Sequence, residues 1–308
     1  MENLVNHTHA QTEHTPDLLA NLLRPDDRLL ILGGSGWFGH TLHTLIGDTV
    51  TTHATASNQR PGYHTWDASR IAAFAPTIVA NFAFLTRERL HTEGTARFIH
   101  TNQKLTAQFL HAASQPNVRL ALTVSSGAAI TEPEHPYGRL KLHEEHQALQ
   151  LQTPTRNIVI ARAYSVTGPH VRRPHDYAFS DFILQARTGT IHIRATTPVY
   201  RRYVSVADYL TVCLALGLDG WTGTIESGGD LHEIGDLAHH IAHIVNPEAT
   251  ITRAHQTSTT PSTYASDNQT WTHACRVLDY QPEDLNQQIR NTATPPQHYL
   301  NQSAHAAM

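Results

Sequence analysis

A short apolar run followed by three regularly spaced glycines constrains the fold of this chain more than any other feature. Residues Arg28–Leu32 have the composition of a buried strand, and Gly33-Gly-Ser-Gly36-Trp-Phe-Gly39 follows directly, at the start of a segment with helical spacing, Trp37–Ile46. In such a turn the first glycine permits the tight bend, the second lets the backbone approach a pyrophosphate, and the third lets the helix pack on the strand. The helix N-terminus then faces the anion. The motif predicts a dinucleotide-binding turn rather than an ordinary glycine turn, and it lacks the Gly-Lys-Ser/Thr of a P-loop.

The pattern of the N-terminal half predicts an α/β fold. Apolar runs of strand length alternate with helical segments, and strands that are apolar on both faces belong to a parallel sheet covered on two sides. We therefore expect a Rossmann-type, doubly wound parallel sheet. The further predicted strands are Thr51–Thr55, Thr77–Asn81, Val118–Ser125 and Asn157–Arg162, and the long helices are Glu93–Ala113 and Tyr137–Gln152.

After residue 165 the elements become shorter and cannot supply another large sheet. We expect an NAD(P)-binding domain at 26–165, then a smaller mixed α/β C-terminal lobe, mostly substrate-binding, at 166–294. A polar tail at 1–25 and a flexible tail at 295–308 flank them. The predicted elements of the lobe are helices near Tyr177–Thr188, Val206–Leu216, His232–Val245, Asp267–Tyr280 and Glu283–Thr292, and strands near Thr190–Arg194 and Tyr200–Val204.

Composition and charge exclude several classes of protein. The 308 residues have a net charge of −4 and no run of lysine or arginine, which argues against a nucleic-acid partner. No apolar stretch reaches the ~18 residues of a membrane span, and no secretory signal is visible at the N-terminus. Cys213 and Cys275 lie far apart and outside any Cys-x-x-Cys motif, which is typical of a reduced compartment. We therefore expect a cytoplasmic protein without membrane or nucleic-acid partners.

Tyr137 and Lys141 lie four residues apart, on one face of a predicted helix. A tyrosine hydroxyl titrates near pH ~10 and is a poor acid or base at neutral pH, but a neighbouring cation lowers its pKa. Only two of the 22 basic residues are lysines, Lys104 and Lys141. A compact ammonium suits this role better than a guanidinium. The pair indicates a tyrosine acid/base supported by lysine rather than an ordinary surface pair.

The strand before this helix ends in Ser125-Ser126-Gly127. A serine hydroxyl at this strand end can hydrogen-bond a substrate carbonyl or alcohol beside Tyr137. The alternative is a serine pair that bonds its own backbone.

These motifs, in this order, resemble the extended short-chain dehydrogenases/reductases, the nucleotide-sugar epimerase/dehydratase group, from about Leu29 to Val245. The Gly-x-x-Gly-x-x-Gly spacing, the segment Ala161-Arg-Ala-Tyr-Ser-Val-Thr-Gly-Pro169 and the segment Val199-Tyr-Arg-Arg-Tyr-Val-Ser-Val-Ala-Asp208 extend the resemblance. It implies an NAD(P)-dependent enzyme that acts on a nucleotide sugar or another small carbonyl compound. It also implies a homodimer, formed through the helices predicted at Glu93–Ala113 and Tyr137–Gln152.

The resemblance assigns roles to single residues. Ser126, with Ser125 as the fallback, completes a catalytic set with Tyr137 and Lys141. Arg201 would clamp a substrate diphosphate and Asp208 would cap the next helix. The implied cofactor-binding residues are Gly33, Ser35, Gly36, Trp37, Phe38, Gly39, Ser57, Asn58, Arg60, Asp67, Ala83, Phe84, Asn102, Tyr137 and Lys141. The implied substrate-binding residues are Ser125, Ser126, Ser165, Arg194 and Arg201.

The end of the second strand bears on the choice of cofactor. An NAD-preferring site usually places an acidic residue there to accept the ribose hydroxyls. The stretch Thr51–Asn58 contains no acid, and Arg60 follows. Ser57, Asn58 and Arg60 are suited to a 2′-phosphate, so the sequence favours NADP, with NAD as the alternative.

Three functions fit these residues. We predict an NADPH-dependent ketoreductase that acts on a nucleotide-linked 4-keto deoxysugar, with Tyr137 protonating the oxygen. The alternatives are an NAD-dependent nucleotide-sugar 4-epimerase and a catalytically silent NADP sensor or scaffold. Gly127-Ala128 stands where 4,6-dehydratases carry an Asp-Glu pair, so elimination chemistry is not expected.

Histidine is abundant, with 24 residues, and His239 and His243 have the i,i+4 spacing of two zinc ligands. No carboxylate or cysteine completes the set in the sequence. We therefore expect no metal and assign the histidine excess to no function.

Overall fold

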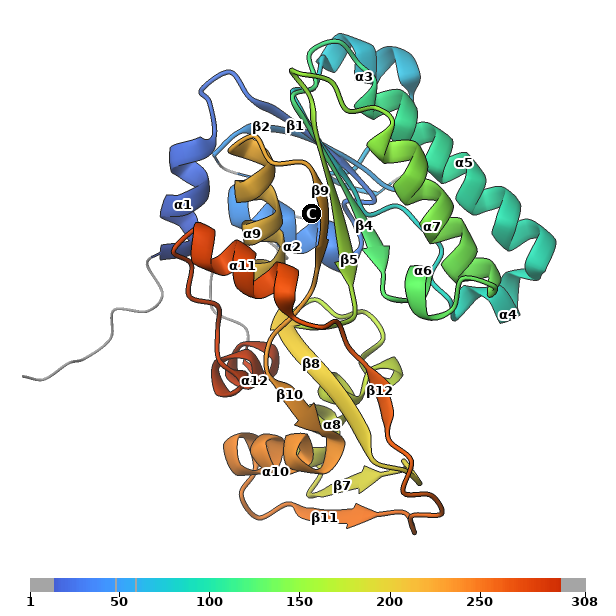
Figure 1. Cartoon of the computed structure of the whole chain (residues 1–308), viewed down its shortest axis with the longest axis vertical. Coiled ribbons are helices and arrows are strands. Elements are labelled where there is room, and N and C mark those ends of the chain that lie inside the picture. Colours follow the sequence, from blue (N-terminus) through green and yellow to red (C-terminus); the bar gives the residue numbers. More distant parts are fainter. Residues whose placement is uncertain (1–13, 48, 59, 295–308) are drawn as a thin grey trace, which may run out of the picture.

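The computed structural model describes residues 14–47, 49–58 and 60–294. Its centre is a six-stranded sheet in the order β2-β1-β3-β4-β5-β9, with every neighbouring pair parallel. The sheet and its helices confirm the predicted Rossmann-type α/β fold (Figure 1). The strands are β1 (Arg28–Leu32), β2 (Thr51–Thr55), β3 (Ile78–Asn81), β4 (Leu120–Ser126), β5 (Asn157–Ala163) and β9 (Gly223–Glu226).

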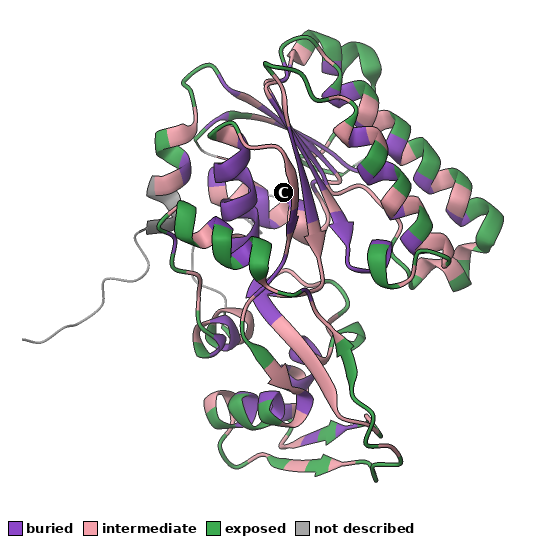
Figure 2. Ribbon diagram, viewed as in Figure 1, coloured by how far each residue is buried: buried purple, intermediate pink, exposed green. Residues whose placement is uncertain are grey.

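Helices cover both faces of this sheet, and its strands are therefore almost wholly buried (Figure 2). On one face α9 packs against α1, α2, β4 and β5, and on the other α7 packs against α5, β4 and β5. This two-sided burial explains why the strands read as continuous apolar runs instead of alternating ones. The helices are α1 (His14–Leu22), α2 (Trp37–Ile46), α3 (Ala68–Phe74), α4 (Arg89–Glu93), α5 (Thr95–Ala113), α6 (Ala128–Thr131), α7 (Pro136–Leu149) and α9 (Val206–Leu218).

A smaller domain lies below the sheet in Figure 1. Strand β8 pairs with β6, β10 and β12, while β7 pairs with β11. A separate apolar cluster from α8, α10, α12 and these strands forms its core. Its elements are β6 (Ser165–Thr167), the 3-10 turn Pro174–Asp176, α8 (Ala178–Arg187), β7 (Thr190–Ile193), β8 (Val199–Ser205), β10 (Leu231–Glu233), α10 (Ile234–Val245), β11 (Thr250–Arg253), β12 (Ser262–Tyr264) and α12 (Leu285–Ala293).

The chain crosses between the two domains more than once. Residues 206–226 return to the large sheet as α9 and β9, and α11 (Gln269–Val277) packs against both. Part of the region 166–294 therefore belongs to the domain of the large sheet. The expected tail at 1–25 contains α1, whose Leu19 is buried, while residues 1–13 and the expected tail at 295–308 lie outside the described part.

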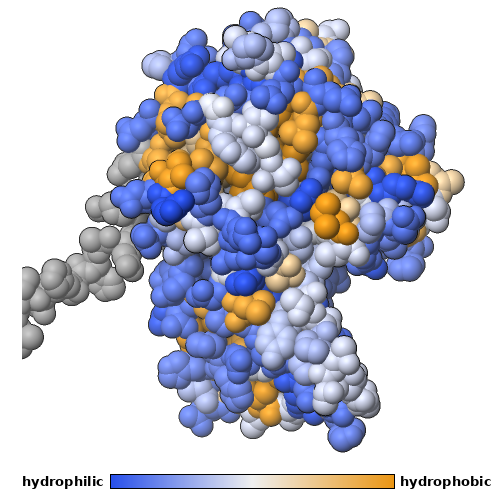
Figure 3. Space-filling view, viewed as in Figure 1, coloured by the Kyte–Doolittle hydropathy of each residue, from blue (hydrophilic) through white to orange (hydrophobic). Residues whose placement is uncertain are grey.

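No helix in the described part of the chain is both long and apolar enough to cross a membrane. On the face drawn in Figure 3, hydrophilic residues predominate and hydrophobic ones form small groups, mainly on the large domain.

Candidate active site

The glycine loop connects β1 to α2, as predicted. Gly33 has a φ of +77°, and a Cβ there would lie 2.7 Å from the backbone nitrogen of Ala83. A Cβ on Gly39 would lie 2.5 Å from the carbonyl oxygen of Gly33, so this glycine allows α2 to approach the loop. Gly36 is the N-cap of α2, and none of the described side chains caps that helix. Its first amides therefore face outward without a side-chain partner, as a bound pyrophosphate requires.

The surroundings of this loop fit a dinucleotide. Trp37 begins α2, and its buried Nε1 atom has no hydrogen-bond partner among the described residues. Its ring meets the ring of Tyr177, at the start of α8 in the small domain, edge to face at 5.8 Å. A polar ligand bound here could accept hydrogen bonds from this unpaired donor and from the open N-terminus of α2. Gly33, Gly36, Trp37 and Gly39 are thus the residues that would hold the cofactor's phosphates.

The end of β2 is open and polar. Ser57, Asn58 and Arg60 are exposed. The ring of Tyr63 lies close to Gly34, since a Cβ there would be 3.2 Å from it. Burial raises the pKa of Tyr63, and the positive charges of Arg172 and Arg60 act against that rise. Arg172 was not predicted from the sequence, and it brings a second cation to this end of the loop.

Asp67 and Asn102, both expected to bind cofactor, have structural partners. The Asp67 carboxylate caps α3 by accepting from the backbone N–H of Arg70 at 3.0 Å. Asn102 is fully buried on α5, and its Oδ1 accepts from the backbone N–H of Leu85 at 2.7 Å. Asn102 therefore positions the segment after β3, which includes Ala83 and Phe84, rather than facing open space.

Ser126, Tyr137 and a third residue, Tyr264, meet where β4 ends. The Ser126 hydroxyl lies 3.1 Å from the Tyr264 hydroxyl and accepts from the backbone N–H of Ala128. Burial raises the pKa of Tyr137, and a hydrogen bond with Ser126 acts against that rise. The structure thus brings the predicted serine and tyrosine together, with Tyr264 of β12 beside them.

The expected influence of Lys141 on Tyr137 needs correction. The lysine was expected to lower the tyrosine pKa, but burial raises it. The Lys141 ammonium instead donates to the carbonyl oxygen of Val124 at 2.7 Å, and its nitrogen lies 3.6 Å from the centre of the Phe84 ring. Burial therefore favours the protonated form of Tyr137, and the phenolate must be stabilised before this side chain can act as a base.

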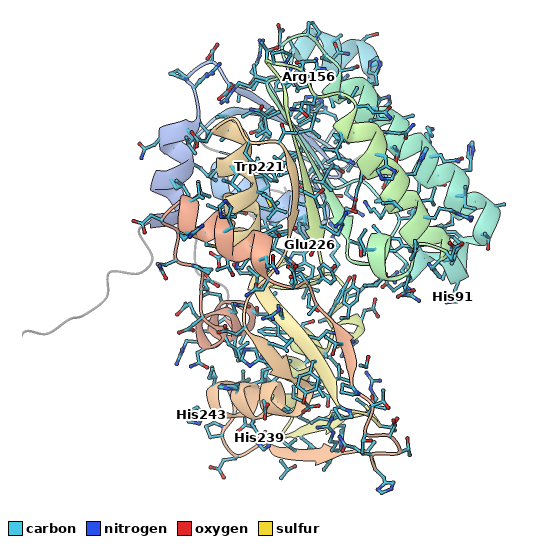
Figure 4. The ribbon with its side chains drawn as sticks, in the orientation of Figure 1. His91, Arg156, Trp221, Glu226, His239 and His243 are labelled. Atoms are coloured by element: carbon cyan, nitrogen blue, oxygen red, sulfur yellow. The ribbon has the colours of Figure 1, made fainter. Side chains whose placement is uncertain are left out.

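Ser125 faces away from this site. Its hydroxyl donates to Glu145 of α7 at 2.5 Å, and Glu145 also binds Arg162 through two hydrogen bonds. Arg162 in turn donates to Glu226 at the end of β9, where the domains meet (Figure 4). Because successive strand residues point to opposite faces, only one of the two serines can face Tyr137, and that one is Ser126.

The predicted substrate-binding residues of the small domain are spread out. Arg201 is on β8, donates to the carbonyl oxygen of Ser262 at 2.9 Å, and lies over the Tyr264 ring at 5.8 Å. Ser165 is on β6, paired with β8. Arg194 is 80% exposed and lies 3.5 Å from Asp181. Of the three, Arg201 is linked to the site, because the Tyr264 ring beneath it carries the hydroxyl that lies next to Ser126.

Asp208 does not cap α9, contrary to the expectation. Ser205 caps it, by accepting from the backbone N–H of Asp208 at 3.0 Å. The buried carboxylate of Asp208 accepts instead from the Tyr280 hydroxyl at 2.6 Å and from the backbone N–H of Glu283 at 2.9 Å. The side chain thereby joins α9 to the segment before α12.

Comparison with known proteins agrees with this geometry. The model of the NAD dependent epimerase/dehydratase family matches residues 29–225, more than half of the chain. The chain belongs to this family. No curated protein matches the sequence at a significant level. As the family implies, the protein is an NAD(P)-dependent enzyme.

Several solved structures share the fold of this epimerase/dehydratase family member. UDP-glucose 4-epimerase from Brucella ovis, in complex with NAD, is 18% identical with a TM-score of 0.69, covering 87% of this chain and 97% of that one. The epimerase Mth375 from Methanothermobacter thermautotrophicus is 17% identical with a TM-score of 0.69, covering 96% and 98%. UDP-N-acetylglucosamine 4-epimerase from Bacillus cereus is 17% identical with a TM-score of 0.68, covering 90% and 99%.

Sequence reasoning missed three residues at the site of this family member: Tyr264, Glu144 and Arg172. Tyr264 is 138 residues from Ser126, and the pairing of β12 with β8 alone brings it close. Glu144 lies three residues after Lys141 on the predicted helix face, so its spacing was a usable signal. His239 and His243 are exposed on α10, away from the site (Figure 4), and the described residues contain no cluster of three metal-ligating side chains.

Proposed function

We propose that the protein is a nucleotide-sugar 4-epimerase, which oxidises one ring carbon of its substrate and reduces it again from the opposite face. The observation that carries the proposal is the meeting of the Ser126 and Tyr137 side chains at the end of β4, with Lys141 buried behind them. When bound, the nicotinamide cofactor supplies the acceptor and donor of hydride. This proposal replaces the ketoreductase as our first choice, because similar folds include 4-epimerases bound to NAD.

The residues of this chain would handle the proton. Ser126 hydrogen-bonds the sugar oxygen and holds it against Tyr137. The oxidation begins with Tyr137 in its phenolate form. That oxygen accepts the hydroxyl proton as the carbon loses hydride, and it returns the same proton after the sugar has turned. Arg201, partly buried on β8 beside Tyr264, would bind the diphosphate, because a guanidinium makes paired hydrogen bonds to phosphate oxygens.

An NADPH-dependent ketoreductase is the second candidate. Arg60 and Arg172 both act electrostatically on Tyr63, in the segment after β2. The sequence Thr51–Asn58 offers no acidic side chain to bind the ribose hydroxyls. Two cations there favour a 2′-phosphate. The same Tyr137 would then donate its proton to the keto oxygen once, with no return step.

Ligand release and product analysis separate the two candidates. The purified protein is denatured and the released cofactor is identified by its mass. Retained NAD, with conversion of a UDP-hexose to its 4-epimer without added cofactor, supports the epimerase. An empty site with NADPH consumption on a 4-keto nucleotide sugar refutes it and supports the ketoreductase.

Tyr137→Phe tests whether the protein is an enzyme of this mechanism. General acid–base catalysis contributes about 10²- to 10⁴-fold. We expect kcat to fall by about that factor while cofactor binding, followed by protein fluorescence quenching, is retained. Unchanged biological activity in the variant would favour the silent sensor or scaffold.

Assembly and location are part of the proposal. Helices α5 and α7 pack against each other on one face of the sheet, and we propose that this pair forms a homodimer interface. Their exposed residues include the polar Gln103, Lys104, His143 and His146 and the small Ala96 and Ala107. Analytical ultracentrifugation checks this, and a monomer at micromolar concentration contradicts it. Cys213 and Cys275 are free thiols, which supports a reducing compartment such as the cytoplasm.

A further inference from the structure

The Lys141 ammonium is enclosed by protein on every side that the structure describes. The residue is 4% exposed. One N–H donates to the Val124 carbonyl oxygen at 2.7 Å, a second faces Glu144 Oε1 at 3.4 Å, and the ring of Phe84 covers a third direction at 3.6 Å. An ammonium has three N–H donors, so each of them has a protein partner.

Glu144 is the negative charge of this group, and it is 1% exposed. Its Oε2 accepts from the Thr106 hydroxyl of α5 at 2.7 Å, and its Oε1 accepts from the Thr123 hydroxyl of β4 at 2.9 Å. Two hydroxyl donors and an ammonium therefore converge on one carboxyl group. These three groups match the acceptor oxygens of a carboxylate.

The directions of these hydrogen bonds are fixed by their neighbours. The backbone N–H of Ala83 donates to Asn81 Oδ1 at 3.2 Å, so the amide nitrogen of Asn81 faces Thr123 and donates to its hydroxyl oxygen at 3.0 Å. The single hydroxyl hydrogen of Thr123 is then free to point only to Glu144. A series of hydrogen bonds with fixed donor and acceptor directions thus runs from Asn81 at the end of β3, through Thr123 of β4, to the Glu144 carboxylate.

We propose that Glu144 is a positioning residue for the reaction, whose carboxylate keeps the buried Lys141 ammonium protonated and fixed behind Tyr137. The importance of that lysine for catalysis rests on the proposed function, while its charge and position do not. Glu144 acts through Lys141, since its own contacts are with Lys141, Thr106 and Thr123.

The charges around Lys141 show why one carboxylate decides its state. Burial lowers the pKa of Lys141, and the charge and hydrogen bond of Glu144 act against that fall. The charge of Glu145 also raises the pKa of Lys141, after the two contributions of Glu144, but that carboxylate is itself paired with Arg162. The elements packed around the ammonium contribute Val124 from β4 and Phe84 from the loop after β3, neither of which is charged. Tyr137, on the same helix, has its protonated form favoured by burial. Without Glu144 the cost of burial is largely uncompensated.

The scarcity of lysine allows a direct test. Protein labelled with [¹³Cε]lysine gives two signals, one from Lys141 and one from exposed Lys104, and Lys104→Arg assigns them. The Lys141 signal is followed from pH 6 to pH 11 in wild type, in Glu144→Gln and in the control Glu93→Gln. Glu93 pairs with Arg89 and Arg97, away from Lys141, so its variant has the same charge change.

We expect a charged Lys141 at pH 7 in wild type and in Glu93→Gln, and a titration midpoint at lower pH in Glu144→Gln. A nearby opposite charge changes proton affinity by about tenfold or more. An unchanged midpoint in Glu144→Gln overturns the proposal. Wild type keeps the test decisive if that variant does not fold, because a Lys141 signal that is already neutral at pH 7 overturns it as well.

Kinetics then link the charge to the reaction. In wild type we expect kcat to fall at alkaline pH as Lys141 loses its proton. In Glu144→Gln that fall moves to lower pH, by the same interval that the NMR midpoint moves, whereas the Glu93→Gln profile stays that of wild type. A shifted NMR midpoint with no shift in the kcat profile overturns the positioning role. A protein with no epimerase or reductase activity leaves the NMR result standing and refutes the proposed function alone.

Discussion

Neutralising Glu283 is expected to make the protein more stable at alkaline pH. The residue lies just before α12, where the buried Asp208 carboxylate accepts from its backbone N–H. Its Oε1 accepts from Asn291 at 2.6 Å, and its buried Oε2 has no partner among the described residues. Burial, together with the charge of Asp208, raises the pKa of Glu283 to about 8.

The sign and size of the effect follow from proton binding. An unfolded glutamate loses its proton near pH ~4.3. Between that pH and about 8 the folded state holds one proton more than the unfolded state, so the free energy of unfolding falls as pH rises. One pH unit corresponds to ~1.4 kcal/mol, which gives at most about 5 kcal/mol over the whole interval. Because the side chain keeps some contact with solvent, we expect about half of that.

Urea unfolding of wild type and Glu283→Gln at pH 5, 7 and 9 measures this. The glutamine keeps an oxygen for Asn291 and cannot ionise. We expect the variant to gain about 2–3 kcal/mol over wild type between pH 5 and pH 9. Exposed Glu248→Gln serves as the control, with no such gain. A difference between Glu283→Gln and wild type that does not change with pH refutes the reasoning.

Two further substitutions test the framework of the large domain. Arg119→Met removes the partner of Asp27, whose side chain is 1% exposed. We expect a loss of about 3 kcal/mol in urea unfolding at pH 7. The Arg119 and Thr77 hydrogen bonds lower the pKa of Asp27 against the effect of burial, so the loss shrinks as acid protonates this carboxyl. A loss below about 1 kcal/mol at pH 7 contradicts this. Gly39→Ala places a methyl group 2.5 Å from the Gly33 carbonyl oxygen, so we expect about 1–3 kcal/mol of destabilisation and weaker cofactor binding by titration calorimetry. Wild-type affinity in this variant would show that the loop tolerates the shift.

The sheet and the glycine loop could be predicted because their signals are local. β1, β4 and β5 are apolar on both faces, and the glycine spacing states where the chain must turn. β9 could not be predicted in this way, since four residues reading GTIE become a strand only by pairing with β5. The short strands β10, β11 and β12 depend on such distant partners too.

In the candidate site, too, the residues close together in the sequence could be predicted, whereas contacts between distant segments could not. Tyr137 and Lys141 share a helix, so their spacing in the sequence places them on one face. The alternation along β4 implies that Ser125 and Ser126 face opposite sides, but only the packing of α7 shows that Ser125 faces Glu145. The pKa of Tyr137 is raised by burial and, in addition, by the electrostatic effect of Tyr264, a residue far along the chain. No local pattern carries that information.

The repeated crossing of the chain makes the two domains inseparable. A fragment ending at Ala163 would include β1 to β5 but would lack β9, leaving the main-chain groups along one side of β5 unpaired. The same cut removes α9, whose residues from Val206 to Leu216 fill the apolar layer on one face of the sheet. An open strand edge beside a bare apolar surface is a template for aggregation. The large domain therefore does not form from the residues up to Ala163 alone, because its central sheet is complete only when β9 has been added, at Glu226.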